Sequence, residues 1–119
     1  MTNKKNIGNL GESKSIEYLE KNYYQIIERN FFCRFGEIDI IAIDIKRNEL
    51  VFFEVKTRTN LLYGMPIESI NNKKIKNIKR TINYYLINKK VKNIDIRIDA
   101  IEVFVHNNKC IIHHVKQIL

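Results

Sequence analysis

The sequence has two cysteines, one proline and no tryptophan. Cys33 and Cys110 form no CxxC pair and no even framework of several cysteines, which argues against a zinc knuckle and a disulfide scaffold. No apolar run approaches membrane-spanning length, and no apolar signal core follows the first residues. We therefore expect a soluble, cytoplasmic protein with reduced thiols and no membrane partner.

At 119 residues the chain suits a single domain, which we expect to span residues 1–119. Lysine and arginine total 21 against 13 aspartates and glutamates, which gives a formal net charge of +8. A charge of this size favours a polyanionic partner such as nucleic acid. Lysine far outnumbers arginine, as AT-rich codons would produce. The charge alone therefore supports nucleic-acid binding only mildly.

Hydrophobic periodicity predicts a mixed α/β (α+β) domain with the order α-βββ-α-ββ. We expect helices at 7–22 and 71–88, strands at 24–31, 37–44, 50–57, 94–105 and 109–116, a loop from Thr57 to Ser69, and a tight turn at His106, Asn107 and Asn108. The buried stripe is expected to contain Ile16, Leu19 and Tyr23 in the first helix and Ile75, Ile78, Ile82 and Tyr85 in the second.

The second and third strands can be aligned by arithmetic. If Lys46 and Arg47 form a two-residue turn, paired residue numbers sum to 93, and every pair from Ile43–Leu50 to Ile40–Phe53 is apolar on apolar. The same register places Asp39 opposite Glu54, and Glu37 opposite Lys56, on one face. Two carboxylates facing each other on buried strands repel, so a cation should compensate them.

Two explanations of this acidic cluster stay open. Hard oxygen ligands suit Mg²⁺ or Mn²⁺, but Lys56 could instead bridge Glu37 and Glu54 on a solvated face. Glu12 falls on the apolar stripe of the first helix, four positions before Ile16. There it either joins the cluster or merely complements the helix dipole in the first turns.

Several motifs together resemble the signature of the YraN family, which consists of small bacterial proteins of uncertain role. The matching residues are Gly11-Glu12, Asn30, Gly36-Glu37-Ile38-Asp39, Phe53-Glu54-Val55-Lys56-Thr57-Arg58, Tyr63-Gly64, Lys74, Tyr85-Leu86 and Arg97-Ile98-Asp99. The resemblance implies a restriction-endonuclease-like fold of the PD-(D/E)XK nuclease superfamily, with a mixed central sheet flanked by helices, related to archaeal Holliday-junction resolvases. Two departures occur: Glu37-Ile38 replaces the usual proline before the motif Asp, and Thr81 and Ile82 stand where the family tends to have alanines.

The resemblance also implies catalytic roles. Asp39 and Glu54 would hold Mg²⁺ (or Mn²⁺), Glu12 would complete the shell, and Lys56 would contact the attacking water or the scissile phosphate. Glu37 is an accessory candidate. These roles predict a metal-dependent nuclease that acts on branched or flapped DNA.

Phosphate contacts are expected from Lys56, Arg58, Lys74 and Arg80, and Tyr63 could stack on an unpaired base. For any one of these residues the alternative is a solvated surface position. We favour DNA over RNA, and a homodimer is compatible with a resolvase-like role. The competing functions are a nucleic-acid-binding or scaffold protein with little or no turnover, and a protein-interaction module.

Overall fold

The computed structural model describes residues 4–59 and 72–119, and its element order is the predicted one. The elements are α1 (Lys4–Lys21), β1 (Tyr24–Cys33), β2 (Gly36–Asp44), β3 (Glu49–Arg58), α2 (Asn72–Asn88), β4 (Asp95–His106) and β5 (Lys109–Val115). Thr57 and Arg58 belong to β3, so the predicted loop begins too early. Most of that loop lies outside the described residues.

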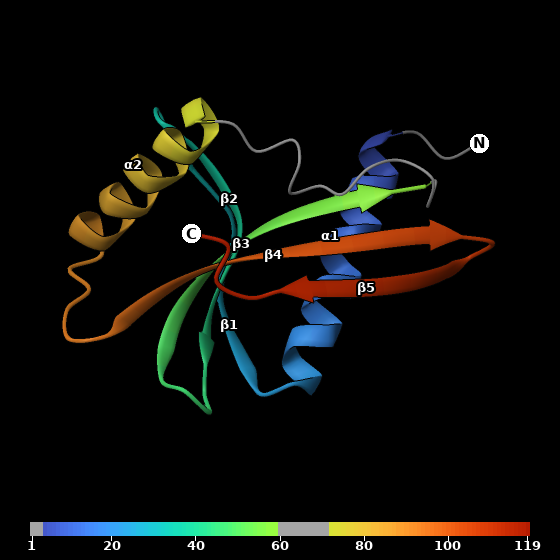
Figure 1. Cartoon of the computed structure of the whole chain (residues 1–119), viewed down its shortest axis with the longest axis horizontal. Coiled ribbons are helices and arrows are strands. Elements are labelled where there is room, and N and C mark those ends of the chain that lie inside the picture. The colour runs from blue at the N-terminus through green and yellow to red at the C-terminus, as the bar shows by residue number, and fades with distance from the viewer. Residues whose placement is uncertain (1–3, 60–71) are drawn as a thin grey trace.

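The strands form one mixed sheet in the order β1-β2-β3-β4-β5 (Figure 1). β3 and β4 are parallel, and the other neighbouring pairs are antiparallel. The chain segment between the two parallel strands contains α2, as a crossover connection requires. The fold class predicted from the sequence is therefore confirmed.

The register of β2 and β3 matches the arithmetic, with Ile43 opposite Leu50 and Ile40 opposite Phe53. The turn itself is longer than predicted. Residues 45–48 form it, and the pair Asp44–Glu49 closes it at the same sum of 93. Asn48 adopts a left-handed φ of 54°, and its N–H donates to the Asp44 carbonyl at 2.8 Å.

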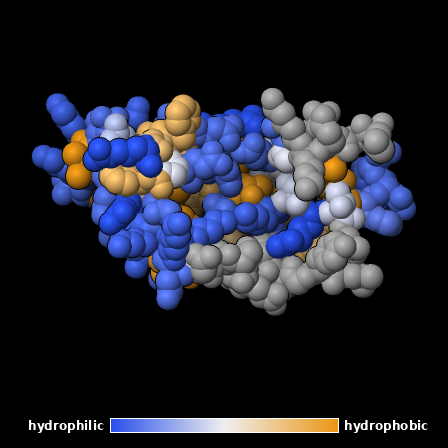
Figure 2. Space-filling view, turned by 90° about the horizontal axis from the view of Figure 1, so that it is seen from above, coloured by the Kyte–Doolittle hydropathy of each residue, from blue (hydrophilic) through white to orange (hydrophobic). Residues whose placement is uncertain are grey.

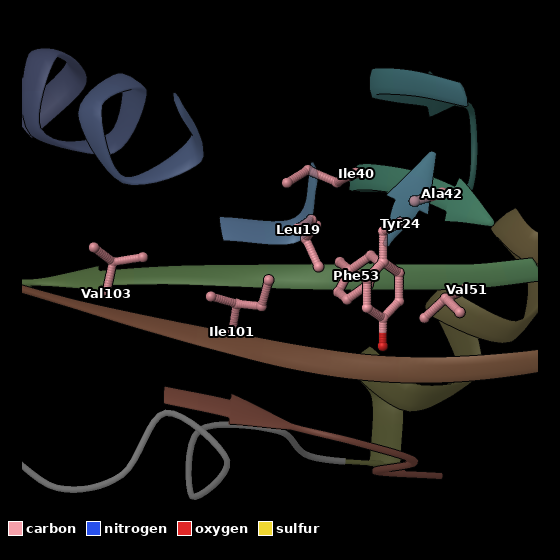
Figure 3. Close-up of a cluster of buried hydrophobic side chains, with 8 residues drawn as sticks. All are labelled: Leu19, Tyr24, Ile40, Ala42, Val51, Phe53, Ile101 and Val103. Atoms are coloured by element: carbon pink, nitrogen blue, oxygen red, sulfur yellow. The ribbon is translucent and has the colours of Figure 1, made fainter. Parts of the chain in front are cut away.

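Successive residues of β3 contribute to two separate cores, as expected of a strand buried on both faces. Val51 and Phe53 lie in a core with Leu19 of α1 (Figure 3). Leu50 and Phe52 lie in a core with the α2 residues Ile78, Ile82 and Tyr85. The helices therefore cover opposite faces of the sheet. Of the helices that the structure describes, none is long and apolar enough to cross a membrane.

α1 approaches the sheet closely at Gly11. A β-carbon there would overlap the Thr57 hydroxyl oxygen, so any residue larger than glycine would require Thr57 or the helix to move. Tyr23 does not extend the buried stripe of the helix, contrary to the prediction. The helix ends at Lys21, and Tyr23 has a left-handed φ of 65° and is 59% exposed. Its neighbour Tyr24 is buried instead.

α2 buries three of the four residues predicted for its stripe, while Ile75 is only half-buried. Thr81 is fully buried as well. It packs close to Gly36, where a β-carbon would lie 3.2 Å from the Thr81 hydroxyl oxygen. The predicted turn between β4 and β5 consists of Asn107 and Asn108, both with positive φ. His106 pairs with Lys109 and so ends β4 rather than forming the turn.

Candidate functional site

β2 and β3 separate beyond the pair Ile40–Phe53. β2 continues to Gly36 against β1, and β3 continues to Arg58 against β4. Figure 1 shows β2 turning away from β3 at this point. We call the opening between the diverging strands the fork. Asp39 is the first residue of β2 beyond the paired segment, so its side chain lies where the strands part.

The Asp39 carboxylate replaces a missing backbone contact between the two strands. Its Oδ2 accepts a hydrogen bond from the Val55 N–H at 2.7 Å. Burial raises the pKa of Asp39 to about 7, and repulsion by the carboxylates of Glu54, Glu12 and Glu37 adds to the increase although the Val55 hydrogen bond opposes it. The Asp39 carboxylate is therefore half-buried, and its ionisation is energetically unfavourable.

Two clefts meet at the fork. The larger, about 750 Å³, lies beside α1 and is lined by Glu12, Asn30 and Arg58 among others. The smaller, about 290 Å³, lies beside α2 and contains Glu54 and Lys74. Both clefts are lined by Glu37, Asp39 and Lys56. Figure 2 shows the surface hollowed in the middle of the face seen from above. The structure thus gathers the predicted residues around Asp39, but Glu12 and Glu54 line different clefts.

Two lysines hold Glu54. Its Oε1 lies 2.9 Å from Lys74 Nζ and 3.4 Å from Lys56 Nζ. Burial and the adjacent Lys74 ammonium lower the pKa of Lys56. Burial also works to lower the pKa of Lys74, but its contact with Glu54 outweighs burial, and the pKa rises. Among the described residues no ion pair joins Lys56 to Glu37, so the predicted bridge between two glutamates is absent there.

Glu12 lies too far along its helix to complement the helix dipole. α1 begins at Lys4, so Glu12 is in the third turn, whereas the dipole effect is confined to the first. Burial raises the pKa of Glu12, and Glu37 raises it further, against an opposing effect of Arg29. Of the two roles considered for Glu12, the structure favours membership of the acidic cluster.

The donor set suits a hard cation, but the side chains do not converge as a complete metal site. Within residues 4–59 and 72–119, no three His, Cys, Asp or Glu side chains are close enough to hold a metal ion. The chemistry nevertheless fits: Asp39 carries a disfavoured charge beside three other carboxylates, and oxygen-only sets of this kind prefer Mg²⁺. Asp39 and Glu54 would hold the ion, with Glu12 across the fork.

The other predicted contacts are dispersed. Arg58 is half-buried in the larger cleft, and its Nε is buried with no hydrogen-bond partner among residues 4–59 and 72–119. Arg80 is exposed on α2 with its guanidinium 5.9 Å from the Phe35 ring. Tyr63, the predicted stacking residue, lies outside the described residues.

A buried polar network that the sequence did not predict lies at the closed end of the β2–β3 hairpin. At its centre is Arg97, which is 5% exposed and donates to Asp44 and Asp99 at 2.9 Å and to Tyr24 Oη at 2.7 Å. His114 joins it through a 2.7 Å contact with Asp99. Despite their burial, contact with Arg97 lowers the pKa of Asp44, and contact with His114 and Arg97 lowers that of Asp99.

Arg97 also donates to Glu49 of β3 at 2.8 Å, so the network joins all five strands at the end of the sheet away from the fork. The sequence signal for it is the motif Arg97-Ile98-Asp99, which places two opposite charges two residues apart on one face of a strand.

Comparison with known proteins identifies close relatives of this chain. Three proteins described as UPF0102 protein, a designation without a stated activity, are similar over most of their length. The one from Caldicellulosiruptor saccharolyticus is 44% identical over 87% of this chain and 86% of its own. The one from Caldanaerobacter subterraneus is 39% identical over 98% and 94%, and the one from Persephonella marina is 44% identical over 92% and 89%.

A solved structure described as "Crystal structure of SSO0001" matches with a TM-score of 0.39 and 16% identity, over 99% of this chain and 54% of that one. This chain thus spans about half the length of that structure, and the likeness is too low to carry an argument. The model of the uncharacterised protein family UPF0102 matches residues 11–103, which include all the residues of the fork. The family resemblance noted from the motifs is confirmed, and the chain belongs to the uncharacterised protein family UPF0102.

Proposed function

We propose that the fork is the active site of a metal-dependent nuclease that hydrolyses phosphodiester bonds in DNA. The observation that carries this proposal is the position of Asp39: its carboxylate is half-buried among three other carboxylates, and Lys56 lines both clefts beside it. The ionised form of a carboxylate in this position is unfavourable in the absence of a cation and is stabilised by a bound divalent cation. The resemblance to PD-(D/E)XK nucleases supports the same assignment.

A bound Mg²⁺ would offset the charge that develops on the phosphate during hydrolysis. Asp39 would hold it through the carboxylate oxygen that does not accept the Val55 hydrogen bond, while that bond fixes the orientation of the carboxylate. Glu54 would contribute a second oxygen once its lysine contacts relax. In the reaction a water loses a proton as its oxygen bonds to phosphorus, the P–O ester bond breaks, and the departing alkoxide takes up a proton to leave as an alcohol.

Lys56 supplies a fixed positive charge. It is held by Glu54 in a partly buried position, so it loses little freedom when a phosphate arrives. Arg58, at the end of the same strand, lines the larger cleft and would contact a neighbouring phosphate.

One observation favours a second candidate, a nucleic-acid-binding protein with little or no turnover. Both lysines engage the same oxygen of Glu54, so the cluster is partly neutralised without any metal. In that case the fork would bind phosphate through Lys56 and Lys74 and would cleave nothing.

The test is cleavage at stoichiometric protein. Purified protein is incubated with branched, flapped, single-stranded and duplex DNA in Mg²⁺, Mn²⁺ or EDTA. We expect cleavage of at least one substrate that requires the metal. Asp39→Asn and Glu54→Gln keep side-chain shape and should abolish it, and Lys56→Ala should lower the rate by about 10²-fold or more, because it removes a fixed charge at the reacting phosphate.

Glu17→Gln is the matched control. Glu17 is an exposed α1 carboxylate paired with Lys14 at 3.3 Å, so its loss should leave cleavage unchanged. DNA binding without cleavage by the wild type under every condition would reject the nuclease and support the binding protein. Cleavage that survives in Asp39→Asn would point to a contaminant or to another site.

A further inference from the structure

A cluster of aromatic and guanidinium groups borders the smaller cleft. Phe35, in the turn between β1 and β2, lines that cleft together with Asp39 and Lys56. The guanidinium carbons of Arg34 and Arg80 lie 4.8 Å and 5.9 Å from the centre of its ring. Tyr84 of α2 packs against the same ring at 6.4 Å between centroids and is 42% exposed.

We infer that Arg34, Phe35, Arg80 and Tyr84 form a platform that binds a single-stranded segment of nucleic acid at the mouth of the smaller cleft. The inference names the substrate class of the proposed active site and in that respect rests on the proposed function. At the α2 end of the molecule, Figure 2 shows hydrophobic side chains with hydrophilic ones lying across them.

Packing of the turn against α2 would explain the contact between Phe35 and Tyr84, but it does not explain the two arginines. Both are exposed, and within the described parts of the chain neither guanidinium lies within ion-pair distance of a carboxylate. A guanidinium stacked on an aromatic ring keeps its N–H edge open for a phosphate. The platform therefore offers stacking planes together with anion-binding edges.

These two features fit single-stranded nucleic acid better than duplex. Bases in a duplex are already stacked on one another, whereas unpaired bases can stack on aromatic and guanidinium planes. The outward face of α2 adds the exposed cations Lys73, Lys76 and Lys79, along which a phosphate backbone can run. Because Phe35 lines the same cleft as Asp39, a strand held on the platform would pass close to the fork.

The inference is tested by fluorescence anisotropy in EDTA, with a labelled oligothymidylate and a blunt duplex of equal length. Arg34→Lys keeps the charge but removes the planar group, and Tyr84→Leu keeps bulk but removes the ring. Loss of one stacking partner should weaken single-strand binding about 10-fold and change duplex binding by less than about 2-fold. Arg34→Lys is an exposed turn substitution, so its result stands even if Tyr84→Leu fails to fold.

Two matched controls use residues of the same types outside the platform. Phe32 is 77% exposed on β1, next to Phe31, which faces α2, and so it points to the other side of the sheet. Arg47 pairs with Glu49 at 3.0 Å at the opposite end of β2. Phe32→Leu and Arg47→Lys should leave single-strand binding unchanged.

Three results would each overturn the platform. The first is unchanged single-strand affinity in both Arg34→Lys and Tyr84→Leu, and the second is an equal loss of affinity for single strand and duplex. The third is displacement of the oligothymidylate by polyglutamate as readily as by unlabelled oligonucleotide. The last would assign the surface to an acidic protein. Binding is measured without metal, so it is independent of cleavage. A protein that binds through the platform but cleaves nothing would reject the nuclease alone, and a nuclease with unaltered binding in both variants would reject the platform alone.

Discussion

Asp39→Asn should stabilise the metal-free protein at alkaline pH. The asparagine can still accept the Val55 hydrogen bond, but it carries no charge among Glu12, Glu37 and Glu54. The pKa of Asp39 is raised from 3.8 to about 7 in the folded protein. A carboxylate with a raised folded-state pKa costs nothing below about pH 4, and the cost grows as the pH rises to about 7 and stays constant above it.

The size of the effect follows from the shift. At 1.36 kcal/mol per pKa unit the full shift corresponds to about 4 kcal/mol. Asp39 is only half-buried and also attracts Lys74, so we expect about 2 kcal/mol, or roughly 10 °C in melting temperature for a domain of this size.

The assay is thermal unfolding of wild type and Asp39→Asn in EDTA at pH 4.5 and pH 8. The variant should melt only slightly higher than wild type at pH 4.5, where about a quarter of the effect is present, and much higher at pH 8. Glu17→Gln, an exposed control, should differ from wild type by less than about 0.5 kcal/mol at both values. A variant equal to or less stable than wild type at pH 8 would refute the electrostatic account of the fork.

Further predictions concern packing, the buried network and phosphate binding. Gly11→Ala should destabilise by about 1 to 3 kcal/mol because its methyl group meets the Thr57 hydroxyl, and adding Thr57→Ala should restore part of the loss in a urea melt. Arg97→Gln should cost about 3 to 5 kcal/mol near neutral pH by leaving Asp44 and Asp99 without their cation. That deficit should shrink as the pH falls below about 4, since both carboxylates have lowered folded-state pKa values and are protonated only in acid; a constant deficit would contradict the assignment. Lys74→Gln combined with Arg80→Gln should flatten the salt dependence of nucleic-acid binding by about one unit of slope for each lost phosphate contact, and an unchanged slope would show that neither residue contacts phosphate.

The sheet could be predicted from the sequence because β3 has a strict apolar pattern. Only a register summing to 93 pairs its residues with apolar partners on β2, so the hairpin was determined by local residues. The fork was not predicted. Ile38 and Ile40 lie in cores on opposite faces, which a flat strand would not allow, and the twist that separates them depends on packing against both helices.

For the candidate site, too, the sequence indicates which residues take part but not the tertiary contacts they make. Asp39, Glu54 and Lys56, which the motifs singled out, line one cleft. The motifs could not show that Lys74, which is distant in sequence, would bind Glu54, or that Glu12 and Glu54 would line separate clefts. The Arg97 network was missed for a related reason: its members come from all five strands, and no spacing within one segment reveals them.

The central claim is that Asp39 forms part of a divalent cation site, and Mn²⁺ titration followed by electron paramagnetic resonance tests it most directly. Free Mn²⁺ gives a sharp signal that protein binding removes. At pH 8 the wild type should remove one Mn²⁺ per chain, Mg²⁺ should compete for it, and Asp39→Asn should leave the signal of free Mn²⁺ intact while Glu17→Gln behaves as wild type. A wild type that leaves the free Mn²⁺ signal unchanged, or an Asp39→Asn variant that binds Mn²⁺ equally well, would contradict the account.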